Sequence, residues 1–159
     1  MQPYVAELLA VVDQTMPSLL AIDDDASRRK PAPGKWSPRE IVGHLIDSAS
    51  NNHQRFVRAP LQDHLIFAGY DQDAWVALQK YQDAPWRDLV ELWAGFNRHL
   101  ARVMASVPEA IRMKPIARHN FDQVAFKPVP ASEPATLDYF MQDYVGHLKH
   151  HLRQILAIS

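Results

Sequence analysis

The sequence contains no cysteine. This absence excludes disulfide bonds, cysteine-based zinc sites and a thiol nucleophile. Neither sign of charge dominates, because 17 Lys and Arg stand against 18 Asp and Glu, for a formal net charge of −1. A chain without a basic field has little attraction for a phosphate backbone, so we expect no nucleic-acid partner.

Long apolar runs are also missing. No segment approaches the roughly 20 apolar residues that cross a bilayer, so we expect no membrane partner. The first 22 residues have no early positive charge, and Glu7 and Asp13 interrupt their apolar residues. This is not the pattern of an export signal, and we expect a cytoplasmic protein. The length of 159 residues and the 47% hydrophobic fraction predict one globular domain over residues 1–159.

Apolar residues recur at helical spacing in four long segments. These segments cover about residues 2–22, 37–58, 85–106 and 136 to near the C-terminus. The second has the clearest start, because Ser37 and Glu40 form a capping box and Pro38 occupies the first helical position. Two long connections, 59–84 and 107–135, separate the later helices. The sequence therefore predicts an all-α four-helix bundle with long crossover connections.

Histidine is abundant, with 8 in the chain, and two interrupt the apolar stripe of the last helix. At steps of three or four residues this stripe comprises Phe140, Tyr144, His147, His151, Ile155 and Ile158. Burying an imidazole without a partner costs about 1–3 kcal/mol, so two on one face require an explanation. Residues four apart point the same way, and their nitrogens can converge on one metal ion. The pair alone also fits two histidines at the edge of the core that bond to carbonyls or water.

A third histidine makes a metal site more specific. On the second helix Ile41, His44 and Leu45 lie on one face, so His44 also borders the core. Three inward histidines, His44, His147 and His151, predict a site with coordination positions left for water or substrate, which is typical of catalytic zinc sites. Because the chain has no thiolate, we expect one divalent ion, for which zinc, nickel and iron(II) are all suitable.

Several polar side chains are candidates for orienting these imidazoles. They are Asp47 and Asn51, one and two turns after His44; Asp143, one turn before His147; and Gln154, three residues after His151. Such neighbours commonly hold a ligating histidine in position, although helical polar residues are often simply solvated. In the 59–84 connection, Tyr70, Asp71 and Trp75 fit either a substrate pocket or a helix cap at Asp71 with Trp75 in the core. We favour the second interpretation.

The remaining histidines are not interpreted as ligands. His150 points to a neighbouring face of the last helix, where we expect it in solvent or at an interface. Four others, His53, His64, His99 and His119, have no histidine or carboxylate partner at a clear ligand spacing. For His119 the question stays open, because the loop that carries it could fold back.

Three segments together resemble a known family. They are KWSPREIVGHLIDSASNNHQRF, FAGYDQDAWVALQKY and DYVGHLKHHLRQI. Their order and separation resemble the DinB/YfiT-like proteins over residues 36–155. The resemblance implies a four-helix bundle that binds one divalent metal ion through three histidines, matched by His44, His147 and His151. Members of that family include thiol S-transferases, in which the metal activates a low-molecular-weight thiol, together with hydrolases and proteins of unassigned activity.

Three kinds of function are open at this point. The first is a metal-dependent enzyme that activates a small thiol or water against a small-molecule substrate. The second is a metal-binding protein without turnover, such as a stress-related binder. The third is an interaction bundle whose histidines are incidental, and metal content separates it from the other two. We also expect a homodimer, because relatives often pair and the helices carry more Trp and Leu than one stripe needs.

Overall fold

The computed structural model describes residues 1–156. The four long helices are α1 (Pro3–Leu20), α3 (Pro38–Arg58), α5 (Trp86–Ser106) and α8 (Leu137–Ile155). The short ones are α2 (Asp24–Arg28), α4 (Gln72–Gln79), α6 (Glu109–Arg112), α7 (Phe121–Val124) and the 3₁₀ turns η1 (Ala59–Leu61) and η2 (Tyr81–Asp83). Within the described residues there are two isolated β-bridges and no strand, so the all-α prediction is confirmed.

Local capping signals explain where the helices begin. The capping box of α3 is present: Glu40 N–H donates to Ser37 Oγ at 3.2 Å, and Ser37 N–H donates to Glu40 Oε1 at 3.1 Å. The predicted cap of α4 is also confirmed, because Asp71 Oδ1 accepts from the backbone N–H of Ala74 at 3.0 Å. The predicted stripe position Ile158 lies outside the described residues.

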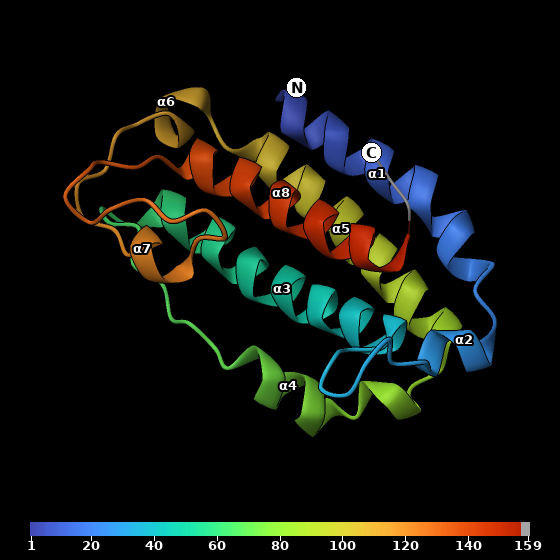
Figure 1. Cartoon of the computed structure of the whole chain (residues 1–159). Helices are drawn as coiled ribbons and strands as arrows, with labels where there is room; N and C mark the ends of the chain where they lie inside the picture. The colour runs from blue at the N-terminus through green and yellow to red at the C-terminus, as the bar shows by residue number, and fades with distance from the viewer. Residues whose placement is uncertain (157–159) are drawn as a thin grey trace.

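The long helices surround a common core in the order α1, α5, α3, α8, since α1 and α3 each contact both α5 and α8. Figure 1 shows that α3 and α5 run in the same direction, opposite to α1 and α8. The 59–85 connection must therefore return along the whole bundle, and it does so outside α3, carrying α4 (Figure 1). The 107–136 connection stays at the end where α5 finishes and α8 begins.

The tryptophans differ in burial between the core helices and the connections. Trp86 and Trp93 are buried in the core. Trp75 is not in the core, contrary to the favoured interpretation, because it is 38% exposed and its ring lies 4.9 Å from that of Tyr70. The reason is that α4 lies on the outside of α3, where its single buried side chain, Val76, makes the inward contact.

A buried arginine fixes the entrance to α3. Arg39 is fully buried, and its Nε donates to Ser27 Oγ at 2.8 Å. The same guanidinium donates to the Ala84 carbonyl and forms an ion pair with Asp24. These contacts tie α2 and the end of the 59–85 connection to the first turn of α3. The segment around Trp36 lies next to the last turns of α8, with the Trp36 ring 6.3 Å from that of His151.

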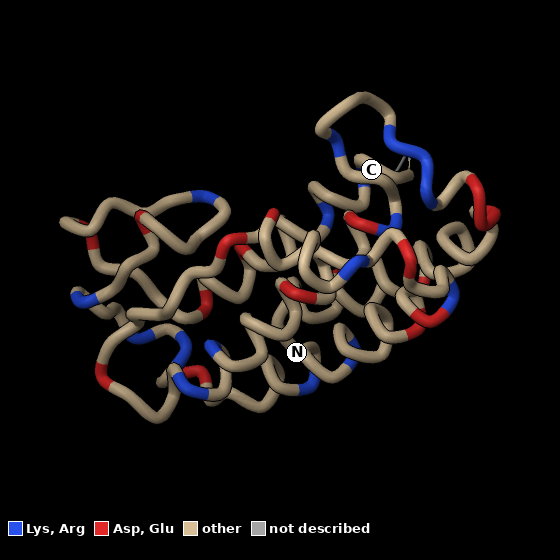
Figure 2. Tube along the Cα trace, turned by 90° about the horizontal axis from the view of Figure 1, so that it is seen from below, with Lys and Arg blue, Asp and Glu red and all other residues tan. Residues whose placement is uncertain are grey.

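The surface carries no strong field of one sign. Figure 2 shows Lys and Arg positions mixed with Asp and Glu positions along the chain trace. Among the described residues, no helix is long and apolar enough to cross a membrane.

Candidate metal centre

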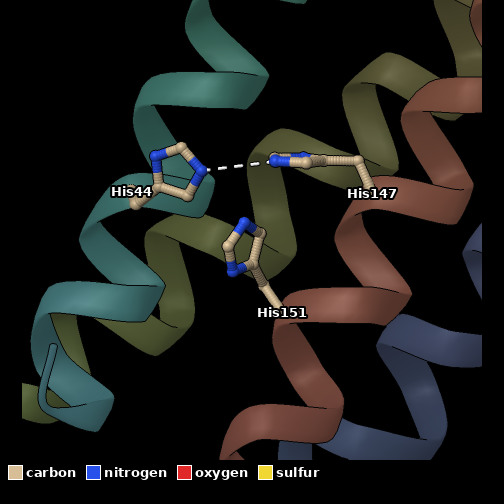
Figure 3. A group of neighbouring side chains, drawn as sticks. All are labelled: His44, His147 and His151. Carbon is tan, nitrogen blue, oxygen red and sulfur yellow. Dashed lines mark hydrogen bonds between the residues drawn. The ribbon is translucent and has the colours of Figure 1, made fainter. Parts of the chain in front are cut away.

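Three histidines converge between α3 and α8. These helices are antiparallel, so the first half of α3, with His44, lies beside the last half of α8, with His147 and His151 (Figure 3). One ring nitrogen from each residue lies within 4.8 Å of the other two. His44 Nε2 and His147 Nε2 lie 3.3 Å apart. The structure thus brings together the three histidines that the sequence analysis selected.

Burial keeps these imidazoles neutral. Burial, with a smaller contribution from the neighbouring His151, lowers the pKa of His44 to about 3. Burial likewise lowers the pKa of His147 and of His151. A neutral imidazole has one nitrogen that accepts rather than donates, which is the form that binds a metal.

The donor set fits a divalent ion of intermediate hardness. Two imidazole nitrogens at 2.0–2.1 Å from a tetrahedral ion lie about 3.4 Å apart. The 3.3 Å between the facing nitrogens of His44 and His147 matches this separation. Three neutral imidazoles without a thiolate suit zinc, nickel or iron(II). Without an ion, the two facing nitrogens can only share a single proton.

One of the four predicted orienting residues contacts the cluster. Gln154 Oε1 lies 2.9 Å from His151 Nδ1 and accepts its proton, which leaves Nε2 as the nitrogen with the lone pair. Asn51 instead donates to the Asp47 carbonyl at 2.9 Å. Asp143 accepts the backbone N–H groups of Phe126 and Lys127 at 2.7 and 2.8 Å, so it anchors the 107–136 connection to α8.

Asp47 has one satisfied and one unsatisfied oxygen. Its Oδ1 accepts from Gln79 Nε2 at 2.8 Å and from the Tyr81 hydroxyl at 2.7 Å. Its Oδ2 is buried without a partner among the described residues. His44 Nδ1, one turn earlier on α3, is also buried and has no hydrogen-bond partner among the described residues. An unused acceptor and an unused ring nitrogen therefore lie one turn apart.

Two cavities border the cluster. One, of about 270 Å³, is lined by His44 and His147 together with Arg55 and Tyr70. The other, of about 740 Å³, is lined by His151 with other side chains that include Trp36, Ile41 and Gln154. The Trp36 ring lies 4.9 Å from that of His44 and so covers this side of the cluster. His44 and His147 therefore line one cavity, and His151 lines the other.

The histidines set aside in the sequence analysis lie away from the cluster or at its edge. His150 is exposed, as expected, with its ring 5.2 Å from that of Phe126. His119 is buried, and its Nε2 lies 2.6 Å from the Glu133 carbonyl while its Nδ1 accepts from the backbone N–H of Phe121 at 3.1 Å. The 107–136 connection therefore folds back on itself around His119.

His53 and His99 have no histidine or carboxylate partner at ligand spacing along the chain, but the fold brings the two rings together. Their Nε2 atoms lie 3.3 Å apart, and Arg102 Nη2 donates to His99 Nδ1 at 3.1 Å. His53 belongs to α3 and His99 to α5, 46 residues away. The spacing within either helix contains no trace of this pair, because it depends on how the two helices pack.

Three residues at the site were not predicted from the sequence. Two of them were not selected, and for Tyr70 another interpretation was preferred. Arg55 is one that a longer stripe would have found, since steps from His44 through Ser48 and Asn52 reach it on the same face of α3. Tyr70 lines the smaller cavity, as its alternative interpretation proposed. Trp36, whose ring lies 4.9 Å from that of His44, was not selected.

Comparison with known proteins identifies the class to which this fold and cluster belong. The sequence model of the DinB superfamily matches residues 7–155, and the chain belongs to that superfamily. The recognition of a DinB/YfiT-like protein from three segments is thereby confirmed. The match also covers α1 from residue 7 onward, a helix for which the sequence offered no family-like motif.

Curated relatives carry the provisional name of metal-dependent hydrolases. YfiT of Bacillus subtilis is 27% identical over 127 residues, which cover 79% of this chain and 65% of YfiT. A protein of Oceanobacillus iheyensis is 22% identical over 129 residues, or 81% of this chain and 72% of the relative. One of Geobacillus thermodenitrificans is 20% identical over 155 residues, or 98% and 82%. This chain thus spans about two thirds of the length of YfiT.

A solved structure of Bacillus subtilis YfiT shares the fold. It superposes with a TM-score of 0.75 at 20% identity, covering 96% of this chain and 81% of the other. Its topology is described as an unusual four-helix bundle. The predicted four-helix bundle is confirmed by this likeness.

Proposed function

We propose that the protein is a metal-dependent hydrolase in which His44, His147 and His151 hold one divalent ion, either zinc, nickel or iron(II). The observation that carries the proposal is the convergence of three neutral imidazoles within 4.8 Å, of which His44 and His147 line one cavity and His151 lines another. The names of the relatives support the same class. When bound, an ion with this ligand set supplies Lewis acidity and lowers the pKa of a water molecule to about 7.

Neighbouring residues orient the histidine rings for metal binding. Gln154 accepts the Nδ1 proton of His151 and so directs the lone pair of Nε2 toward the other two rings. We propose that Asp47 does the same for His44, because its unpartnered oxygen and the unpartnered Nδ1 of His44 are both buried one turn apart. Gln79 and Tyr81 hold the other oxygen of Asp47 in place.

The smaller cavity is the proposed position of a small-molecule substrate. It places His44 and His147 on one wall and the aromatic rings of Phe126, Phe140 and Tyr144 on others. A low-molecular-weight thiol could occupy the same space, so thiol S-transfer is the alternative reaction to be tested. In either case the residues of the cavity wall orient the reacting molecule and exclude bulk water.

The experiment compares metal-loaded protein with a variant that lacks one ligand. Protein loaded separately with zinc, nickel or iron(II) is assayed against a panel of small esters and amides, and against small thiols with an electrophile. We expect ester or amide hydrolysis well above that of His151→Ala. A rate seen only with a thiol would reassign the chain to S-transfer. No rate above the variant in any assay would contradict an enzymatic function.

A further inference from the structure

Arg55, near the end of α3, is a buried cation without a counter-charge. Arg55 is only 7% exposed. Nη2 donates to the Ala68 carbonyl at 2.8 Å, and Nη1 donates to Asn52 Oδ1 at 3.5 Å. Both acceptors are neutral. Across residues 1–156, no carboxylate lies within ion-pair distance of this guanidinium.

Arg39 is a second buried arginine, and it has a counter-charge. It is also on α3 and fully buried, but it forms an ion pair with Asp24. Removing a charge from water is costly unless a partner of opposite charge replaces the lost hydration. Burial lowers the pKa of Arg55, because it destabilises the charged form of the side chain. Arg55 therefore lacks a partner that Arg39 possesses.

The unpaired guanidinium faces the cavity beside the histidines. Arg55 lines the same space of about 270 Å³ as His44 and His147, and it is the one Lys or Arg among the described residues of that wall. Asp143 also lines the cavity, but both of its oxygens accept backbone N–H groups. Tyr70 is neutral there, because burial raises its pKa to about 12.

We propose that Arg55 binds the carboxylate of a small organic acid, which is the natural occupant of this cavity. A single guanidinium balances a monoanion, whereas a phosphate dianion would keep an unbalanced negative charge in a buried site. The planar guanidinium also matches the two oxygens of a carboxylate. The Phe140 ring, 5.8 Å from the guanidinium carbon, adds an apolar wall for the hydrocarbon part of the acid.

The position of Arg55 relative to the histidines also indicates a class of substrate. His44 and Arg55 are eleven positions apart on α3, a rise of about 16 Å along the helix axis, and both reach into one cavity. An acid held at Arg55 therefore extends its remaining atoms toward His44 and His147. As a statement about the substrate this rests on the proposed hydrolase function, whereas carboxylate binding at Arg55 does not.

Binding to metal-free protein tests the proposal without reference to turnover. Benzoate and its neutral isostere benzamide are titrated into chelator-treated protein and followed by NMR. We expect benzoate to bind at least tenfold more tightly than benzamide. Arg55→Gln should weaken benzoate at least tenfold and abolish the preference. The matched control is Arg58→Gln, an exposed arginine on the same helix that bonds only to Gln54, and it should bind as the wild type does.

Three results would overturn the inference. They are equal binding of benzoate and benzamide by the wild type, a preference that survives in Arg55→Gln, and tighter binding of inorganic phosphate than of benzoate. Circular dichroism establishes that each variant is folded. If Arg55→Gln does not fold, Arg55→Met, which also removes the charge, replaces it, and a preference for benzoate that survives in that variant would equally refute the proposal. A failed hydrolase assay leaves all of these outcomes unaffected.

Discussion

Gly43 is the position where fold and site are most tightly coupled. It precedes His44 in the middle of α3, and the ring of Tyr81 packs directly against it. A Cβ added at Gly43 would lie 2.1 Å from Tyr81 Cδ2 and 2.3 Å from Cγ. Real contacts of this kind need more than 3 Å, so the ring of Tyr81 must move. Its hydroxyl would then lose the hydrogen bond to Asp47.

The expected cost of Gly43→Ala combines three effects. Alanine favours the helix over glycine by about 1 kcal/mol. Forcing a methyl group into a closed contact costs about 1–3 kcal/mol. Loss of the hydrogen bond between Tyr81 and the Asp47 carboxylate costs about 1.5–3 kcal/mol. The free energy of unfolding should therefore fall by about 1.5–5 kcal/mol.

Urea denaturation followed by circular dichroism measures this change. The matched control is Gly95→Ala in α5, where an added Cβ has no atom within 4 Å. The control should gain about 0.5–1 kcal/mol, since only helix propensity acts there. Opposite signs for the same chemical change would isolate the contact with Tyr81. A Gly43→Ala variant at least as stable as the wild type would refute the reasoning.

Three further predictions concern other positions. Asp47→Asn should weaken zinc binding about 10- to 100-fold by calorimetry, because the oxygen proposed to accept from His44 is lost; unchanged affinity would show that Asp47 only holds Tyr81. Burial, with a contribution from His99, lowers the pKa of His53, so the neutral form stabilises the fold above about pH 6.5 and stability is lost as the pH falls below it. His53→Gln should lose less stability than the wild type between pH 7 and 5, and an NMR-measured pKa at or above 6.5 would contradict this. Pairing of two chains stays a prediction, which a monomeric mass in sedimentation equilibrium at micromolar concentration would contradict.

Local signals account for what the sequence predicted well. The capping box at Ser37 and the apolar stripe of α8 depend on residues a few positions apart. They fix the facing sides of two helices, and three histidines on those sides then lie together once the helices pack. Gln154 belongs to the same category, because it is three residues from His151 on one helix.

What the sequence did not predict depends on contacts between distant segments. The cavity wall combines Arg55 of α3 with Tyr70 from the connection to α4 and Phe126 from the connection to α8. Neither connection has a period that fixes where its side chains point. The pair of His53 and His99 likewise follows from the parallel packing of α3 on α5. Such placements are set by tertiary packing rather than by spacing.

The central claim is that His44, His147 and His151 hold one divalent ion. Metal analysis of zinc-loaded protein after gel filtration tests it most directly. The wild type and the exposed-histidine control His150→Ala should each retain about one ion per chain, whereas His44→Ala, His147→Ala and His151→Ala should each lose most of it. Loss of zinc in His150→Ala with full retention in His147→Ala would contradict the account, as would a wild type that retains none.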